Sequence, residues 1–313
     1  MNRRDAFGES IGLFESATDK DGLHLKMYGV SVRFGAETFS HQFTSTGAVA
    51  DLRSVSKVVT AMVLGNVIER RISYVGRSIS LDTCAIEVLE PVVRSSVSTN
   101  WKYVTLRHLM NNTIGHEEGF LFRKDIGDRK EDDFINYIFA APVPHAPGGH
   151  FSYSNVGPFL ISVVLEAITG RSLFELAQES VFEPLGISAS WRRFGEFTAG
   201  STGLHMSSDD LLKLATVLRD GGKYNRAELV SGAWAAEMRR PISLTPKMYD
   251  PSRVFPKYAY GLGLWICENG SFYCDGTNGQ YLIVVPERDL AVSTTGEQPD
   301  MKPITRCMLP LLT

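Results

Sequence analysis

The sequence predicts an α/β (α+β) fold: an antiparallel sheet built from both ends of the chain, flanked by helices, with a large, mostly helical inserted region. Two observations predict it. Runs of β-branched and aromatic residues, which favour strands, occur near both ends, at 24–35, 37–45, 258–274 and 280–295. From about 76 to 250 the pattern is mostly helical. The simplest arrangement is one sheet that joins the two ends, with the helical region packed against it.

A length of 313 residues allows one or two domains. We expect residues 1–75 and 255–313 to form the α/β sheet domain, and residues 76–254 to form the mostly helical domain. The active site is expected in the cleft between them.

Individual elements follow from local signals. A helix precedes the first strand, and the segment 54–72 is apolar on nearly every face for three turns, so it belongs in the middle of the protein. Thr105 starts one helix, Gly170 ends another, and 207–222 has Ser/Asp at its start and two glycines at its end. A short helix is expected at the C-terminus.

The pair Asn269-Gly270 predicts a two-residue hairpin turn. In that register Cys267 lies opposite Phe272, and Trp265 lies opposite Cys274 in an aromatic cleft wall. The two cysteines are then diagonal neighbours at roughly 7 Å, which is long for a disulfide.

Composition excludes several classes of function. The chain is 43% hydrophobic and 21% charged, and a net charge of −3 with a pI near 6.2 gives no general attraction for nucleic acid or anionic membranes. No secretory signal or membrane-spanning apolar run is visible. We expect a cytoplasmic protein whose four scattered cysteines form no metal or redox motif: Cys84, Cys267, Cys274 and Cys307.

The motif Ser54-Val55-Ser56-Lys57 opens the buried helix. The S-x-x-K spacing places Ser54 and Lys57 one turn apart on the same helix face. Because burial disfavours the ammonium form, Lys57 is expected to be neutral often enough to accept the serine proton. This pair is our candidate nucleophile and base.

A second motif, Tyr153-Ser154-Asn155, lies between a Pro/Gly loop and an apolar helix. A loop tyrosine facing Ser54 could act as a phenolate base or relay a proton to a leaving group. Asn155 could orient Lys57 and a substrate carbonyl. A buried structural tyrosine is the alternative for Tyr153 alone.

Two other patterns are weaker. Ser10 lies in a G-x-S-x-G sequence but lacks the preceding strand that a nucleophile elbow requires. His116, Glu117 and Glu118 do not match the H-E-x-x-H zinc motif, and no third ligand has a useful spacing. We expect no metal site and no organic cofactor.

Taken together, these motifs resemble the serine β-lactamase and penicillin-binding-protein superfamily. The tyrosine favours its class C-like branch, which includes family VIII-type esterases, D-aminopeptidases, 6-aminohexanoate-dimer hydrolases and several acyltransferases. The resemblance covers most of the chain. It extends to "VTLRHLMNNTIGHEEG", "PHAPGGHFSYSNVGPFLISVVLEAITGRSLFELAQESVFEPLGI", "AGSTGLHMSSDDLLKLATVL" and "YGLGLWI".

The resemblance implies that Ser54 forms an acyl-enzyme, that Lys57 and Tyr153 share general base and acid work, and that Asn155 positions groups. It also implies an oxyanion hole made by the backbone N–H groups of Ser54 and Thr277. Thr277 directly follows the third motif, which is Cys274-Asp275-Gly276 in this chain.

This third motif departs from the family, which usually has Lys-Thr-Gly or His-x-Gly. Cys274 cannot bind a carboxylate as the lysine does, and Asp275 would repel an anionic substrate if it faced the cleft. The expected substrate is a neutral or amine-bearing ester or amide. Cys274 as an alternative nucleophile lacks a nearby histidine in the sequence.

We therefore expect a serine hydrolase that cleaves a small-molecule ester or amide through acyl-Ser54. Acyl transfer from the same site is one alternative, and D-aminopeptidase, β-lactamase or DD-peptidase activity is another. A non-catalytic binding protein with the same fold is the third. The sequence does not identify the substrate or the oligomeric state.

Overall fold

The computed structural model describes residues 2–44, 48–94, 97–127, 129–250 and 254–312. Within these residues an eight-stranded antiparallel sheet runs in the order β12-β13-β14-β15-β16-β17-β1-β2. The strands are β1 (Met27–Phe34), β2 (Glu37–Gln42), β12 (Ser243–Leu244), β13 (Ala259–Tyr260), β14 (Trp265–Ile266), β15 (Phe272–Gly276), β16 (Gln280–Val285) and β17 (Leu290–Gly296).

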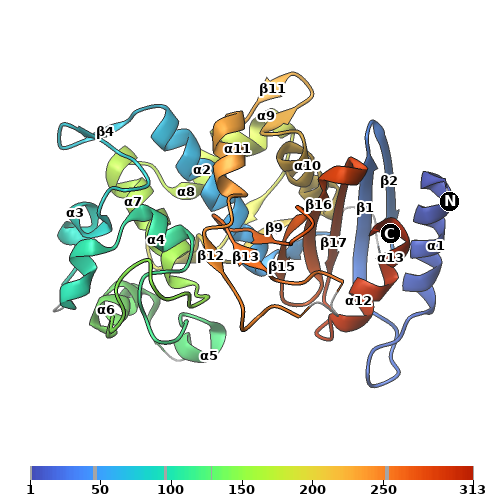
Figure 1. Cartoon of the computed structure of the whole chain (residues 1–313), viewed down its shortest axis with the longest axis horizontal. Coiled ribbons are helices and arrows are strands. Elements are labelled where there is room, and N and C mark those ends of the chain that lie inside the picture. Colours follow the sequence, from blue (N-terminus) through green and yellow to red (C-terminus); the bar gives the residue numbers. More distant parts are fainter. Residues whose placement is uncertain (1, 45–47, 95–96, 128, 251–253, 313) are drawn as a thin grey trace.

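The sheet joins the two ends of the chain because β1 pairs with β17, so blue and red strands adjoin in Figure 1. The prediction of one sheet built from both ends is confirmed. The last residue of the predicted strand 37–45, Ser45, lies outside the described residues.

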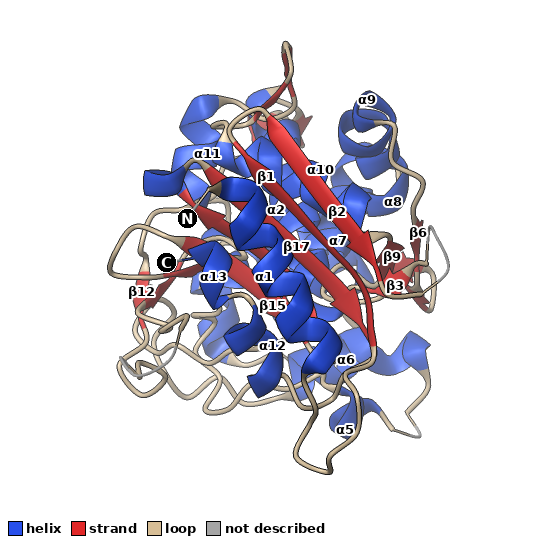
Figure 2. Ribbon diagram, turned by 90° about the vertical axis from the view of Figure 1, so that its right-hand side faces the viewer, coloured by secondary structure: helices blue, strands red, loops and turns tan. Residues whose placement is uncertain are grey.

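Helices from both chain ends cover one face of this sheet (Figure 2). They are α1 (Arg3–Ser16), α12 (Lys302–Cys307) and α13 (Leu309–Leu312). Phe14 of α1 and Ile304 of α12 share an apolar cluster with Val30 and Val32 of β1. Side chains at every second strand position reach this face, which fits the strand periodicity of β1.

The opposite face packs on α10 (Ser208–Arg219), which contacts β17, β1 and β16. The α10 helix begins where the Ser207 side chain accepts the Asp210 N–H, as the capping signal in the sequence predicts. Leu211 and Leu214 of α10 join Val284 and Ala291 of the sheet in a second, larger apolar cluster.

The central helix is α2 (Ser56–Glu69), preceded by a 3₁₀ turn at Arg53–Val55. Ten consecutive residues, 56–65, are buried, which confirms the prediction of a helix enclosed on all sides. Gly65 lets Trp234 lie against the helix, because a Cβ there would sit 2.3 Å from the indole ring. The indole N–H of Trp234 donates to the Ala61 carbonyl at 3.0 Å.

The segment between the two groups of strands is mostly helical, as predicted. Thr105 caps the helix that follows it, and Gly170 ends another helix in the left-handed region, with a φ of 69°. The helices are α3 (Ala85–Leu89), α4 (Leu106–Met110), α5 (Arg123–Ile126), α6 (Phe134–Ala140), α7 (Val156–Thr169), α8 (Leu173–Ala177), α9 (Glu183–Leu185) and α11 (Gly232–Met238).

Short strands complete the fold. A three-stranded sheet contains β3 (Ala50–Asp51), β9 (Leu204–Met206) and β6 (Ser190–Trp191). The hairpin strands are β4 (Ser73–Tyr74), β5 (Arg77–Ser78), β7 (Arg193–Phe194), β8 (Phe197–Thr198), β10 (Lys223–Tyr224) and β11 (Ala227–Glu228). Both β12 and α10 come from the range 76–254 yet join or cover the main sheet. The proposed division into two domains stays a prediction.

The predicted two-residue turn at Asn269-Gly270 is wrong by one residue. Trp265 pairs with Tyr273, and the Cys267 N–H donates to the Ser271 carbonyl at 2.9 Å, so the loop spans three residues. Gly270 has a φ of 77°, which suits a three-residue loop ending in a left-handed glycine. Cys267 therefore shares a face with Trp265, while Cys274 points to the opposite face, and both thiols are free.

Within the described part of the chain, no helix combines the length and apolar character needed to cross a membrane.

Candidate active site

The chain makes a tight turn immediately before Ser54. Arg53 has a φ of 52°, a left-handed conformation that a non-glycine residue adopts at an energetic cost. Asp51 holds this turn: one carboxylate oxygen accepts the Arg53 N–H at 2.9 Å, and the other lies 2.9 Å from the Arg53 guanidinium. The strained turn sets Ser54 at the entry to α2.

Lys57 lies one helical turn beyond Ser54 and is 1% exposed. Its Nζ donates to Ser54 Oγ at 2.9 Å, to Asn155 Oδ1 at 2.7 Å and to the Ser201 carbonyl at 3.1 Å. Burial lowers the pKa of Lys57 to about 7, against a smaller raising effect of Asp275. Near neutral pH the amine therefore exchanges readily between its charged and neutral forms.

The segment Tyr153–Asn155 lies against Lys57 from the opposite wall, just before α7. The Asn155 Nδ2 donates to the Leu121 carbonyl at 3.0 Å, which orients its Oδ1 toward the lysine. Asn112 Oδ1 accepts the Ser154 N–H at 3.0 Å. These bonds fix the segment that carries the tyrosine.

The ring centroid of Tyr153 lies 5.1 Å from Lys57 Nζ. Burial raises the pKa of Tyr153, Asp275 raises it further, and the Ser54 hydroxyl lowers it by less. The phenol is therefore protonated throughout the neutral range, which leaves Lys57 as the group able to take a proton there.

The third motif approaches the turn before Ser54 through Gly276 at the end of β15. A Cβ on Gly276 would sit 2.3 Å from the Leu52 carbonyl oxygen and 2.9 Å from Arg53 Cβ. Only glycine lets the strand pass this close to the turn before Ser54. Thr277 follows directly and is exposed.

Cys274 and Asp275 point to opposite sides of β15. The Cys274 thiol is buried near Lys57, and burial raises its pKa well above the usual range, with a further contribution from Asp275. The carboxylate of Asp275 accepts the Trp265 indole N–H at 2.9 Å and lies 3.5 Å from Lys257 Nζ. The Asp275 carboxylate thus has a cation and an indole N–H as partners. Repulsion of an anionic substrate by Asp275 stays a prediction.

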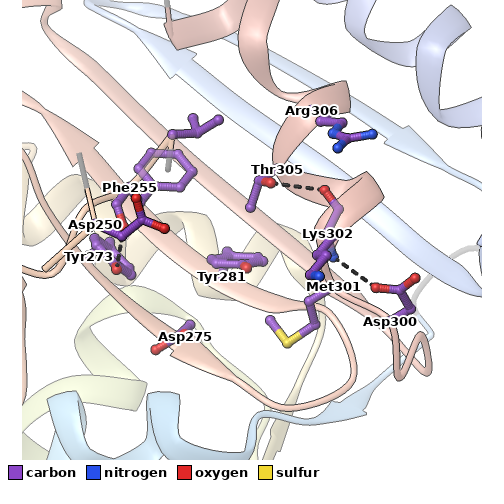
Figure 3. A pocket seen from close by; sticks show the side chains of 11 residues that line it. Asp250, Phe255, Tyr273, Asp275, Tyr281, Asp300, Met301, Lys302, Thr305 and Arg306 are labelled. Atoms are coloured by element: carbon purple, nitrogen blue, oxygen red, sulfur yellow. Dashed lines mark hydrogen bonds between the residues drawn. The ribbon is translucent and has the colours of Figure 1, made fainter. Parts of the chain in front are cut away.

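A pocket of about 720 Å³ lies between β15, β16, the residues near Phe255 and α12 (Figure 3). The residues that line it do not include Ser54, Lys57, Tyr153 or Asn155, and Asp275 is the lining residue next to Gly276 in the sequence. The lining combines aromatic and apolar side chains with one threonine and charges of both signs. The apolar and aromatic residues are Val254, Phe255, Tyr273, Tyr281 and Met301, and the polar ones are Asp250, Asp275, Asp300, Lys302, Thr305 and Arg306.

The structure thus brings together the predicted residues Ser54, Lys57, Tyr153 and Asn155, with β15 alongside. The sequence reasoning missed three contributors. Ser201 acts through its carbonyl, which no side-chain motif reveals. Arg53 contributes the left-handed backbone conformation of the turn before Ser54, which its residue type does not reveal. Lys257 contacts Asp275 because the loop before β13 brings it there, and no local sequence pattern predicts that contact.

The weaker candidates lie elsewhere. Ser10 is buried in α1 and donates to the Cys307 carbonyl at 2.8 Å. The His116 Nδ1–H donates to the Pro142 carbonyl at 2.9 Å, and Glu117 pairs with His145. Across the described ranges, no three His, Cys, Asp or Glu side chains are grouped so that they could hold a metal ion.

Comparison with known proteins agrees with this geometry. A sequence model of the family described as Beta-lactamase matches residues 8–301. Among solved structures, EstCE1, a hydrolase with promiscuous acyltransferase activity, has a TM-score of 0.76 at 16% identity, covering 99% of this chain and 98% of its own. A D-stereospecific amidohydrolase from Streptomyces sp. has a TM-score of 0.71 at 18% identity, covering 96% of this chain and 98% of its own.

A penicillin binding protein from Bacillus halodurans is similar to the same degree. Its TM-score is 0.71 at 17% identity, and the match covers 92% of this chain and 97% of that protein. Structural likeness at these identities establishes a shared fold, and the family match extends over nearly the whole sequence. The chain belongs to the β-lactamase family.

Proposed function

We propose that the protein is a serine hydrolase that cleaves a carboxylic ester or amide through an acyl-Ser54 intermediate. The observation that carries this proposal is the 2.9 Å contact between Lys57 Nζ and Ser54 Oγ, made by a buried lysine whose pKa is about 7. A base poised near neutral pH beside a hydroxyl is what nucleophilic catalysis requires.

In the acylation step, neutral Lys57 takes the proton of Ser54 as Oγ forms a bond to the substrate carbonyl carbon. The carbonyl electron pair moves to oxygen, and the N–H groups of Ser54 and Thr277 are our candidates to stabilise that oxyanion. Collapse of the tetrahedral species breaks the bond to the leaving group. The proton held by Lys57 passes to the leaving alcohol or amine, with the Tyr153 hydroxyl as relay.

Deacylation repeats these roles with water. Water loses a proton to Lys57 as its oxygen attacks the acyl carbon, and Ser54 regains a proton as the acid departs. Asn155 keeps Lys57 oriented in both steps, since its Oδ1 lies 2.7 Å from the ammonium nitrogen. Cys274 is assigned no proton transfer, because burial keeps its thiol protonated.

The substrate class follows from the walls of the site. Aromatic side chains surround Tyr153, with Trp265 stacked at 5.2 Å and Tyr260 at 5.8 Å between ring centroids. We propose an ester or amide with an apolar group next to the scissile bond. Because Lys257 offsets Asp275, the charge of residue 275 alone does not decide the charge of the substrate.

The test is hydrolysis of a panel of p-nitrophenyl esters, D-amino-acid nitroanilides and a chromogenic cephalosporin by the wild-type chain and by Ser54→Ala. We expect turnover of short- or medium-chain esters, or of the amides, by the wild type alone. Equal turnover by Ser54→Ala would remove Ser54 as nucleophile. Absence of both turnover and acylation would leave a binding role for the fold.

Acyl transfer is the second candidate, supported by the aromatic walls, which disfavour water relative to an organic acceptor. It would use the same acyl-Ser54, with an alcohol or amine in place of water. Product analysis with added alcohol distinguishes the two: ester product in excess of free acid at low alcohol concentration indicates transfer, and free acid alone indicates hydrolysis.

A further inference from the structure

Lys257 reaches the third motif from a separate segment, just before β13. Its Nζ lies 3.5 Å from Asp275 Oδ2 and 4.2 Å from the ring centroid of Trp265. The Lys257 side chain is 12% exposed and that of Asp275 is 24% exposed. This pair is therefore much less solvated than a surface ion pair, and its charges are less screened.

Trp265 links this pair to the candidate site. Its indole N–H donates to Asp275 Oδ1 at 2.9 Å, so the two carboxylate oxygens are held by two different partners. The Trp265 ring stacks on Tyr153 at 5.2 Å with an interplanar angle of 27°. Movement of Asp275 would therefore disturb the wall that carries the tyrosine.

Asp275 also acts on Lys57 electrostatically. The titratable groups that face Lys57 are Tyr153, Cys274 and Asp275, and burial keeps the first two protonated at neutral pH. Asp275 favours the charged form of Lys57. A chain of contacts joins Asp275 to Lys57: Trp265 binds the carboxylate and stacks on Tyr153, whose ring centroid lies 5.1 Å from Lys57 Nζ. Lys257 is the cation paired with Asp275.

Other charged groups lie on the pocket side of Asp275. Asp250, Asp300, Lys302 and Arg306 line the pocket with it and carry charges of both signs. Lys257 differs from them because it contacts the Asp275 carboxylate itself. Its removal would leave the Asp275 carboxylate without this paired positive charge.

We propose that Lys257 is a positioning residue that holds the Asp275 carboxylate against Trp265 and offsets its charge, so that Lys57 can be neutral when Ser54 attacks. The role of Lys257 in catalysis rests on the proposed function. The effect of Lys257 on the protonation of Lys57, called the link below, does not. The ion pair supplies a positive charge beside a strand whose own residue 274 is a thiol.

The primary test measures Lys57 itself. In protein labelled with ¹³C at lysine Cε, the Lys57 resonance is assigned by its absence from Lys57→Arg and titrated by NMR. In Lys257→Met the titration midpoint of Lys57 should rise by roughly half a unit or more, because Asp275 is left uncompensated. In Asp275→Asn it should fall, and Lys257→Met/Asp275→Asn should return it toward or below the wild-type value. Lys257→Arg should leave it nearly unchanged.

Lys223→Met, on the exposed hairpin strand β10, is the control for loss of one lysine charge. An unchanged Lys57 midpoint in folded Lys257→Met would overturn the proposal, whatever Asp275→Asn shows. If Lys257→Met does not fold, Lys257→Gln takes its place, because it also removes the charge of residue 257, and the same outcomes decide.

The second readout is the pH profile of kcat/KM, whose acidic limb should move with the NMR midpoint in each variant. A structural role alone would lower kcat/KM at every pH without moving the limb. If the Lys57 midpoint shifts as expected but the wild type neither turns over substrate nor acylates Ser54, the proposed function fails and the link stands. If the wild type is active and the midpoint does not shift, the link fails and the function stands.

Discussion

Lys57 Nζ lies 2.9 Å from Ser54 Oγ, and the same nitrogen is held by Asn155 Oδ1 at 2.7 Å and by the Ser201 carbonyl at 3.1 Å. Lys57 is 1% exposed, and these three acceptors hold its amine next to the Ser54 hydroxyl. The residues come from the start of α2, the start of α7 and the loop before β9, so the site depends on the packing of the whole fold.

The first prediction concerns pH. Lys57 must be neutral to accept the serine proton, and its pKa is about 7. Log kcat/KM should therefore rise with pH below about 7 and level off above it, with no fall up to about pH 9, because burial raises the pKa of Tyr153. Lys57→Arg, whose guanidinium stays charged, should lose about 10²-fold or more in kcat/KM. A flat profile from pH 5 to 9 would contradict this role.

The same lysine predicts a pH dependence of stability. Its pKa in the folded state, about 7, lies below the ordinary value of 10.5, so between these values the unfolded state binds more protons. The free energy of unfolding of the wild type relative to Lys57→Gln should then increase with pH above 7, by up to about 1.4 kcal/mol per unit. Below pH 7 the difference should be constant. Urea unfolding from pH 6 to 9 measures it, and a constant difference over that whole range would count against the shifted pKa.

Gly276 is predicted to tolerate no side chain. In Gly276→Ala the new Cβ would meet the Leu52 carbonyl at 2.3 Å, so β15 must move away from the turn before Ser54. We expect a loss of roughly 1–3 kcal/mol in stability and a loss of activity larger than that destabilisation explains. Gly12→Ala is the matched control, since nothing lies within 4 Å of its Cβ position. Wild-type activity in Gly276→Ala would show that this close approach is not needed.

Cys274→Ala tests the alternative nucleophile. Because burial keeps the Cys274 thiol protonated, we expect kcat/KM to stay within about threefold of wild type, at a stability cost of about 1 kcal/mol for the lost sulfur. Circular dichroism and thermal unfolding verify the fold. A folded Cys274→Ala protein without activity would return the thiol to the mechanism.

Elements with local signals could be predicted from the sequence. The all-round apolar pattern after Ser54 predicted the central helix, and Thr105 and Gly170 predicted helix ends, because each depends on neighbouring residues alone. The register between β14 and β15 was wrong by one residue. Asn-Gly fits both a two-residue turn and a three-residue loop with glycine in the left-handed position, and the choice depends on pairing across the strands.

Within the site, the S-x-x-K and Y-x-N motifs identified residues that lie together in the structure. The spacing of Ser54 and Lys57 places both on one helix face, and Tyr153 and Asn155 lie in one short segment before α7. The ion pair of Lys257 with Asp275 could not be foreseen in the same way. It depends on the path of the segment before β13, which no periodic pattern describes. The sequence predicts that Asp275 would repel an anionic substrate if it faced the cleft, and the structure gives its carboxylate two partners, Lys257 and Trp265.

The central claim is that Ser54 forms the acyl-enzyme, and the most direct measurement is the intact mass of the folded protein after reaction with a fluorophosphonate probe, followed by peptide mapping. We predict one adduct per chain on Ser54, faster labelling above pH 7 than below it, and no adduct in Ser54→Ala. Ser10→Ala, which removes the serine of the G-x-S-x-G sequence, should label like the wild type. An adduct on another residue, or equal labelling of Ser54→Ala and the wild type, would contradict the account.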